Sequence, residues 1–318
     1  MWGSMGRGLR QAVGALATAA AATVALAAGL ALAGFLDWRL DVLTHFAPGY
    51  VIVALAAMLV GAVAGAPWRG RALALGAATI VATAGLMAPE YLRKPEPPTA
   101  STPGQIRIVQ FNAFKRNIDI DRAATWIVAQ KPDIVTLQEV RHDLRDELIR
   151  RTGWEVAGRK EHVMILSREK RLRMVRPPIG TAPLTYLSAT YPSESGPFEV
   201  VTTHFDWPTY DTHGQQHVGL VRVVRQLPRE RMIVTGDFNA TPWSYALRRT
   251  DRDLGLSRRD RALFSFPTRL WRVDGPPPLL PIDHIYAGPG WRTVSLERGP
   301  TLGSDHYPLV ITLAPVGR

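Results

Sequence analysis

The stretch Met232–Ser244, "MIVTGDFNATPWS", places a carboxylate and an amide two residues apart at the end of an apolar run. The apolar residues before Gly236 predict a buried strand. Residues i and i+2 of a strand point to the same face, so the side chains of Asp237 and Asn239 are expected to point the same way at its carboxyl end. Asp and Asn are also common turn formers, and for this stretch alone a turn ended by Pro242 is the simpler interpretation. Other parts of the chain decide between the two.

The composition bounds the possible partners. The chain has 318 residues, enough for about two domains, and no cysteine, which excludes disulfides and thiolate metal sites. Its formal net charge is +11, of which residues 1–96 carry +3 (seven Lys/Arg, four Asp/Glu) and the remainder +8 (31 and 23). A basic body favours acidic partners: nucleic acid, anionic lipid headgroups or phosphorylated small molecules.

The composition also predicts three parts. Residues 1–90 are rich in Ala, Leu, Val and Gly and nearly uncharged, so we expect an N-terminal membrane domain there. Residues 91–104 are Pro-rich and polar, as in a semi-extended linker. Residues 105–318 have the composition of an ordinary globular domain, and we expect them to fold separately from the first part.

Three charge-free runs predict about three transmembrane helices: Gln11–Leu36, Val42–Trp68 and Ala72–Pro89. About 20 apolar residues cross the ~30 Å hydrocarbon core, so the first two runs are long enough and the third is marginal. A cleaved signal peptide explains the first run alone, and a buried helical domain explains all three. If these runs span a membrane, residues 11–89 are expected to contact the lipid bilayer.

The loop charges predict the orientation of these spans. Arg7 and Arg10 precede the first run, and the second loop, "PWRGR", carries two more arginines, so both are expected in the cytoplasm. Three spans then place residues 105–318 outside the cytoplasm, in a multi-pass protein of the cell membrane. Arg93 and Lys94, just after the third run, oppose this orientation.

Strand and helix patterns alternate after residue 105. The segments "IRIVQFNAF", "DIVTLQEV", "HVMILSR", "LTYLSATYP", "FEVVTTHFDWP" and "RMIVTGDFN" predict strands, with "PIDHIYAG" and "SDHYPLVITL" as the last two. Helices are predicted for "DRAATWIVAQKP", for "DLRDELIRRTG" with Gly153 as its C-cap, and for "GQQHVGLVRVVRQLP". Strands that follow one another directly indicate mixed sheets packed face to face, with helices outside.

Polar residues stand at the ends of many of these strands. They are Asn112, Glu139, His204, Asp237, Asn239, Asp283, Asp305 and His306. Each one alone has an ordinary explanation, such as a surface charge, a satisfied histidine or a turn. Their joint occurrence is different, because ligands bind outside strand carboxyl ends in open α/β sheets. Carboxylates gathered at such an edge repel one another, and a bound cation removes that repulsion.

These motifs carry a family resemblance. In order and spacing, "QFNAF", "DIVTLQEV", "TTHF", "VTGDFNATPWS", "PIDHI" and "GSDHYPL" resemble the endonuclease/exonuclease/phosphatase superfamily over about residues 105–315. That group includes pancreatic-type DNase, abasic-site endonucleases, inositol polyphosphate 5-phosphatases and bacterial sphingomyelinases. The resemblance implies a four-layered α/β sandwich, here preceded by a three-helix transmembrane segment. It also implies that residues 105–318 are the catalytic domain of a metal-dependent phosphoric ester hydrolase.

The resemblance also implies a role for each residue. Glu139, Asn112 and Asp305 match the family's Mg²⁺ site, with Mn²⁺ as an alternative ion, and hard oxygen ligands suit that cation. Asp237 would orient or deprotonate the attacking water, and Asn239 would hold that water or a phosphate oxygen. His306 would contact the scissile phosphate, with Asp283 fixing its tautomer. His204 would donate to another phosphate oxygen.

Other residues do not align with the family's pattern. Many relatives place a Tyr or Glu near the strand "HVMILSR" to grip the phosphate, and the nearest residues here, Glu161 and His162, read better as surface residues. Two Arg-rich stretches, "SREKRLRMVR" and "LRRTDRDLGLSRRDR", could grip an anion, but solvated charged faces are the default interpretation.

The sequence leaves the substrate open between three hypotheses. The first is a tethered phosphohydrolase for a lipid-linked phosphate or pyrophosphate; bacterial relatives of similar layout, including teicoplanin-resistance membrane proteins, would suggest polyprenyl pyrophosphate. The second is an extracytoplasmic nuclease for DNA or RNA, which the basic body permits. The third is a non-catalytic binding module, against which the complete residue set argues.

Overall fold

A computed structural model of the chain describes residues 2–158, 162–175, 183–270, 273–274 and 277–316. Contacts within the chain divide it into two compact units. The first is Met1–Arg93 with the short segment Thr241–Ala246, and the second is Lys94–Ala240 with Leu247–Arg318.

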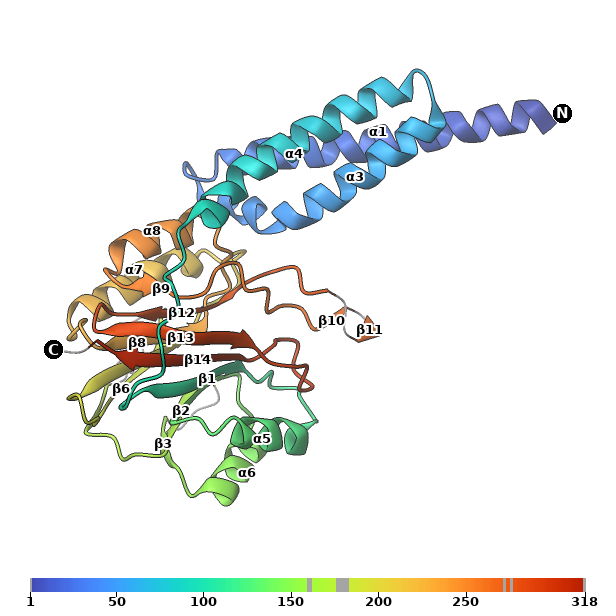
Figure 1. The fold of residues 1–318 in the computed structure, drawn as a ribbon. Helices are drawn as coiled ribbons and strands as arrows, with labels where there is room; N and C mark the ends of the chain where they lie inside the picture. The colour runs from blue at the N-terminus through green and yellow to red at the C-terminus, as the bar shows by residue number, and fades with distance from the viewer. Residues whose placement is uncertain (1, 159–161, 176–182, 271–272, 275–276, 317–318) are drawn as a thin grey trace. The chain divides into compact units, whose positions relative to one another are not determined.

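The first unit is helical (Figure 1). It contains α1 (Trp2–Leu32), α2 (Trp38–Asp41), the 3-10 helix η1 (Val42–Phe46), α3 (Ala47–Ala64) and α4 (Trp68–Leu92). Three stretches are long and apolar enough to cross a membrane: Gly6–Leu32, Trp38–Ala64 and Trp68–Leu92. The prediction of three such helices is confirmed.

The boundaries of the third helix were predicted wrongly. The expected loop "PWRGR" is mostly helix, because α4 already begins at Trp68 and includes Arg69 and Arg71 in its first turn. The guanidinium carbon of Arg71 lies 5.4 Å from the centroid of the Trp68 ring, within the ~6 Å reach of a cation–π contact. The marginal length of the third apolar run therefore came from placing its start too late.

Small residues allow these helices to approach closely. A Cβ atom on Gly61 would collide with the Cβ atom of Ala72, and one on Gly76 would collide with Met58. Gly14 meets the Trp68 ring in the same way, whereas Gly29 has no neighbour that close. Close backbone contact at small residues is the usual way that apolar helices pack together in lipid.

The second unit is built on two mixed sheets of six strands. The first has the order β13-β14-β1-β2-β4-β3 and the second β5-β6-β7-β8-β12-β9. The strands of the first sheet are β1 (Ile106–Asn112), β2 (Ile134–Gln138), β3 (Glu155–Ala157), β4 (Val163–Ser167), β13 (Trp291–Arg298) and β14 (Leu309–Pro315). Those of the second are β5 (Arg173–Val175), β6 (Thr185–Tyr191), β7 (Phe198–His204), β8 (Met232–Asp237), β9 (Ser257–Arg258) and β12 (Asp283–Ala287). The strands β10 (Arg269–Leu270) and β11 (Val273–Asp274) pair antiparallel as a separate two-stranded sheet.

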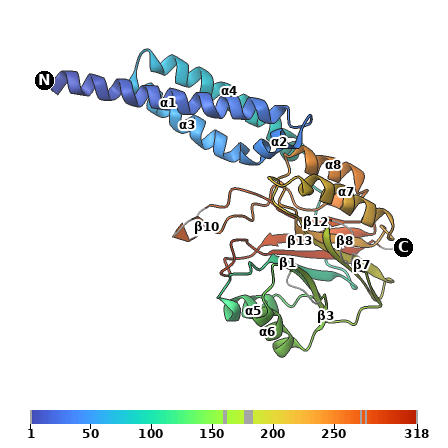
Figure 2. The same ribbon diagram turned by 180° about the vertical axis from the view of Figure 1, so that it is seen from behind.

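Helices cover the outer face of each sheet (Figures 1 and 2). The helices α5 (Ile120–Ala129) and α6 (His142–Thr152) lie on the first sheet, and α7 (Thr212–Arg225) and α8 (Tyr245–Asp253) on the second. One apolar core fills the space between the sheets, around residues such as Ile108 and Ile233, and each sheet packs a further core against its own helices. The predicted four-layered α/β sandwich is confirmed.

Several elements were missed from the sequence: the short strands β3, β5, β9, β10 and β11, the longer strand β13 and the helix α8. The expected last two strands, "PIDHIYAG" and "SDHYPLVITL", are separated by β13, whose mixed sequence "WRTVSLER" reflects its place as a half-exposed edge strand. The helix α8 was also missed, since its sequence "YALRRTDRD" is mostly charged and only Leu247 and Thr250 are buried. The predicted C-cap of α6 is confirmed, with Gly153 in the left-handed conformation at φ 67°.

The strand pairing brings polar residues from both sheets to one edge. Within the first sheet β1 and β2 are parallel, with Asn112 opposite Gln138, so that Asn112 and the following Glu139 leave at the same end. Within the second sheet β7 and β8 are parallel, with His204 opposite Asp237. The antiparallel β12 starts at the same edge, with Asp283 opposite Asp237.

Candidate active site

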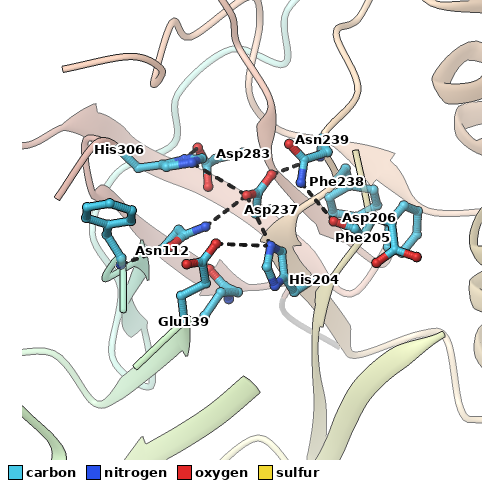
Figure 3. Close-up of polar contacts among 12 residues, drawn as sticks. Asn112, Glu139, His204, Phe205, Asp206, Asp237, Phe238, Asn239, Asp283 and His306 are labelled. Atoms are coloured by element: carbon cyan, nitrogen blue, oxygen red, sulfur yellow. Dashed lines mark hydrogen bonds and ion pairs between the residues drawn. The ribbon is translucent and has the colours of Figure 1, made fainter. Parts of the chain in front are cut away.

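The carboxylate of Asp237 is the centre of the candidate site (Figure 3). It is only 1% exposed. Its Oδ2 accepts a hydrogen bond of 2.9 Å from Asn112 Nδ2, and lies 3.6 Å from the Nε2 atoms of both His204 and His306. The two sheets therefore aim side chains at a single buried carboxylate oxygen.

Close packing explains the glycine that precedes this aspartate. Gly236 has φ +154°, and a Cβ atom there would collide with the carbonyl oxygen of Thr203 on the neighbouring strand. Only glycine allows β8 to approach β7 this closely, and that approach sets Asp237 beside His204.

Behind Asp237 lies a buried pair of an acid and a histidine. Asp283 Oδ2 is 2.8 Å from His306 Nδ1, and Asp283 Oδ1 accepts a hydrogen bond of 2.9 Å from Gln110 Nε2. Burial alone would lower the pKa of His306, but the carboxylates of Asp283 and Asp237 outweigh it and raise that pKa to about 10. His306 is therefore an imidazolium at neutral pH, with Nδ1 directed to Asp283 and Nε2 directed towards Asp237.

The pKa values of Asp237 and Asp283 are shifted in opposite directions. Burial raises the pKa of Asp237, and the nearby His306 lowers it only in part. Burial would also raise the pKa of Asp283, but the charge and hydrogen bond of His306 outweigh it and lower that pKa. Asp283 is thus the partner of the imidazolium, whereas Asp237 is the more basic of the two.

Glu139 lies on the more open side of the site. Its Oε1 is 3.7 Å from His204 Nε2, and its backbone adopts a left-handed conformation with φ 48° directly after β2. Burial raises the pKa of Asp305, and the carboxylate of Glu139 raises it further. The charge of His306 lowers this pKa, but by less. Glu139 and Asp305 are therefore close enough to repel one another electrostatically.

The acidic groups of the site could hold a metal ion in two ways. Asp237, Asp283 and His306 form a buried cluster whose ligand atoms lie within 4.8 Å of one another. Glu139 and Asp305 offer further carboxylate oxygens, and Asn112 an amide oxygen, although Asn112 Oδ1 also accepts a hydrogen bond of 3.1 Å from the backbone N–H of Phe114. All of these except His306 are the hard oxygen donors that suit Mg²⁺.

Asn239 reaches the site differently from the prediction. The strand β8 ends at Asp237, and Asn239 lies beyond it at φ 46°, so strand alternation does not orient its side chain. Its backbone N–H instead donates to Asp237 Oδ1 at 2.8 Å, and its Nδ2 donates to the carbonyl of Phe205 at 2.8 Å. The stretch is therefore both a turn and part of the site, and the two interpretations of the sequence do not exclude each other.

Two histidines that the sequence interpretation missed hold this turn from behind. His213 Nε2 lies 3.1 Å from the carbonyl oxygen of Phe238, and His284 Nε2 lies 2.8 Å from that of Ala240. Burial lowers the pKa of His213 to about 4, so its neutral ring donates from Nε2. The carbonyls on both sides of Asn239 thus receive an imidazole N–H.

His284 is itself fixed by a buried ion pair. Its Nδ1 lies 2.7 Å from Asp260 Oδ2, which also accepts from Arg258 at 3.0 Å. The attractions of His284 and Arg258 outweigh burial and hold the pKa of Asp260 far below its usual range. The sequence offered a signal for this pair, since His284 follows Asp283 on a strand and therefore points to the opposite face.

The remaining sequence candidates lie elsewhere. Glu161 is outside the described residues. His162 is exposed and contributes its backbone carbonyl, which accepts from Glu139 N at 3.2 Å. In the second Arg-rich stretch Arg258 and Arg259 are buried in ion pairs with Asp260 and Glu96, so they do not form a solvated face.

Comparison with known proteins agrees with this arrangement. Residues 109–306 match the model of the Endonuclease/Exonuclease/phosphatase family. None of the curated proteins compared with the chain matches it.

Solved structures share the fold at low sequence identity. An endonuclease/exonuclease/phosphatase from Bacteroides vulgatus is 20% identical, with a TM-score of 0.58 over 68% of this chain and 100% of its own. The human Nocturnin catalytic domain with bound sulfate is 19% identical, with a TM-score of 0.53 over 67% and 94%. D. rerio TDP2 complexed with a single-strand DNA product is 15% identical, with a TM-score of 0.54 over 66% and 99%.

The matched region contains every polar strand end from Asn112 to His306, on a sandwich of the same architecture. The chain belongs to the endonuclease/exonuclease/phosphatase family, whose members are hydrolases of phosphoesters.

Proposed function

We propose that this protein is a membrane-anchored, metal-dependent phosphohydrolase that uses a water activated by Asp237. The observation that carries the proposal is the surroundings of the Asp237 carboxylate. It is buried, its pKa is raised by that burial, and Asn112, His204 and His306 all point at its Oδ2. A structural turn residue has no need of two histidines and an amide around one oxygen.

The chemistry that follows is an in-line attack of water on phosphorus, in which the bond from phosphorus to the oxygen of the leaving alcohol or phosphate breaks on the opposite side. Asp237 Oδ2 accepts a proton from the attacking water, and its raised pKa makes it a better base than an ordinary aspartate. His306, kept protonated by Asp283, donates from Nε2 to a non-bridging oxygen and stabilises the charge that develops there. His204 donates to a second oxygen, and Asn239 holds the turn that fixes Asp237.

A divalent cation completes this assignment. Glu139, Asp305 and Asn112 would hold it, since the two carboxylates repel each other and the histidine–carboxylate pair of His306 and Asp283 is already satisfied by its own hydrogen bond. A Mg²⁺ or Mn²⁺ ion held there would supply positive charge opposite the phosphate oxygens. This arrangement is favoured over the buried cluster of Asp237, Asp283 and His306.

For the substrate we favour a lipid-linked phosphate or pyrophosphate. Three helices that are long and apolar enough to cross a membrane tether the hydrolase, and tethering raises its effective concentration for a lipid headgroup. Polyprenyl pyrophosphate fits this description.

A nuclease is the second candidate function. D. rerio TDP2, with its single-strand DNA product, shows that this fold accommodates a nucleic-acid strand in that protein. The net charge of +8 over residues 97–318 also favours a polyanionic substrate. A non-catalytic binding module is disfavoured, because binding alone does not require Asp237, Asp283 and His306 together.

We further propose that the hydrolase lies outside the cytoplasm, anchored in the cell membrane. Arg7 and Arg10 support a cytoplasmic N-terminus, and three crossings then place residue 94 onward outside. A reporter fused after residue 318 that is active only in the cytoplasm would overturn this orientation and leave the chemistry untouched.

The test of the proposed function is a hydrolysis panel with the full chain in detergent micelles and Mg²⁺. The panel contains polyprenyl pyrophosphate, sphingomyelin, an inositol phosphate and plasmid DNA. We expect release of phosphate from the polyprenyl substrate, loss of that activity in EDTA and its return with Mg²⁺ or Mn²⁺. Cleavage of plasmid DNA alone would support the nuclease instead, and full activity in chelator would remove the metal from the proposal.

A further inference from the structure

A basic groove lies beside the candidate active site, between the two loops that leave the first sheet. The strands β1 and β2 are parallel neighbours, so the loops that follow Asn112 and Glu139 emerge side by side. Together they line an open groove of about 600 Å³, formed by Lys115, Arg116, Val140, Arg141, His142 and Asp143. None of these residues has a role in the hydrolysis proposed above.

The charge of this groove is positive. Lys115 and Arg116 are exposed, and Arg141 is half-buried. Asp143 is the one acid among the lining residues, and it is paired with Arg141 at 2.6 Å. The two cations of the first loop therefore face the groove with no acid of the lining left to balance them. A groove of one charge raises the local concentration of oppositely charged groups.

The groove is held at a fixed place relative to the site. The backbone N–H of Lys115 points to Glu139 Oε2 at 3.5 Å, and that of Phe114 donates to Asn112 Oδ1 at 3.1 Å. Phe114 and Glu139 both adopt left-handed backbones, at φ 57° and 48°, which turn the chain sharply as each strand ends. Both walls thus begin at residues proposed to hold the metal, and the groove continues outward from them.

We propose that this groove binds a second phosphate of the substrate, next to the phosphate that is hydrolysed. The inference rests on the proposed function and assigns the substrate class as a diphosphate ester. A single neighbouring phosphate suits the site better than a nucleic-acid strand, because the basic lining comes from two short loops and ends with them. A strand needs a longer basic track along its backbone.

The experiment compares two substrates that differ by one phosphate, geranyl monophosphate and geranyl diphosphate. The full chain in detergent micelles is assayed as wild type and as the double variant Lys115→Glu/Arg116→Glu. The matched control is Arg222→Glu/Arg225→Glu, which makes the same change in net charge at exposed positions of α7. We expect the preference for the diphosphate, as a ratio of kcat/KM values, to fall roughly tenfold in the groove variant and to stay unchanged in the control. The loss should lie in KM, with kcat on the monophosphate unaltered.

A binding measurement keeps this inference separate from the proposed function. Titration calorimetry with inorganic diphosphate should show roughly tenfold weaker binding to the groove variant than to wild type, with inorganic monophosphate bound equally by both. If the wild type hydrolyses neither ester, the proposed function fails while the calorimetry still decides about the groove. Unchanged diphosphate binding would overturn the second-phosphate site. So would a variant that loses more cleavage of single-stranded DNA than binding of diphosphate, since the groove would then serve a strand.

Discussion

The two sheets place polar residues at strand ends in the same way, but these residues differ in solvent exposure. Each contributes a parallel pair of strands, β1 with β2 and β7 with β8, whose carboxyl ends meet at one edge. The side chain of Glu139, after β2, remains 25% exposed, whereas that of Asp237, at the end of β8, is 1% exposed. The same backbone geometry therefore yields one open carboxylate and one buried carboxylate.

From that difference we infer separate roles for the two sides of the site, metal binding at Glu139 and proton transfer at Asp237. A partly exposed carboxylate is accessible to a cation and to the substrate that arrives with it, so we expect the Glu139 side to bind the metal. A buried carboxylate is destabilised as an anion, so the Asp237 side suits proton transfer. Each variant described below changes one residue on one of these two sides.

The largest effect is expected from Asp237→Asn. Asn keeps the shape and still accepts the N–H of Asn239, so the chain should fold, but it cannot take a proton from water. We expect kcat to fall by about 10²–10⁴-fold with nearly unchanged KM, as for loss of a general base. Steady-state kinetics of the full chain measure it, with the exposed Asp211→Asn as control. A fully active variant would return this stretch to a simple turn.

On the open side, Glu139→Gln should act through the metal. The amide retains the size of the side chain but loses the charge that attracts the cation. We expect half-maximal activity to require about 10–100-fold more Mg²⁺, with a smaller change in kcat at saturating metal. The measurement is a metal titration of activity, beside Glu230→Gln, which changes an exposed glutamate. Equal metal requirements in the two variants would place the cation with Asp237, Asp283 and His306 instead.

We expect the pair behind Asp237 to set the alkaline limit of activity. The pKa of His306 is raised to about 10, so the imidazolium persists through neutral pH and is lost as the pH rises through 10. Asp283→Asn removes the largest attraction that raises this pKa, so the alkaline limb of the kcat/KM profile should move to lower pH, by about one to three units. A limb that stays in place would show that His306 does not act as a donor.

The sequence allowed the fold, and most of the residues that converge in the candidate site, to be predicted for a physical reason. Apolar runs beside Asn112, Glu139, His204, Asp237 and Asp283 predict strands and the position of these polar residues at strand ends. The parallel pairing of β1 with β2 and of β7 with β8 then brings those ends to one edge. Where long-range packing decides, the same reasoning fails. Asn239 is oriented by a left-handed turn and by Phe205, and no local pattern announces either contact.

Elements that support the site were also not predicted from the sequence, because long-range packing determines them. The helix α8 has too few buried residues for its period to show, and β13 is a mixed-sequence edge strand. Asp260 stands in an Arg-rich stretch that looks like a solvated face, yet it is buried, because Arg258 and His284 supply opposite charges from other positions. Charges that neutralise one another across the fold cannot be recognised from spacing along the chain.

The smallest effect on activity is expected from His284→Asn, which probes the support of the buried side. His284 links Asp260 to the carbonyl of Ala240 and touches no reacting group, so it acts as a positioning residue. Asn is too short to bridge both partners, and an unmet buried carbonyl costs about 1–3 kcal/mol of stability. We expect that loss in urea unfolding and a fall in kcat of about tenfold or less, with KM and the metal requirement unchanged. His284→Gln, which reaches further, should recover part of both. A change in the metal requirement equal to that of Glu139→Gln would contradict the division between the two sides, because the support of the buried carboxylate would then also govern the open one.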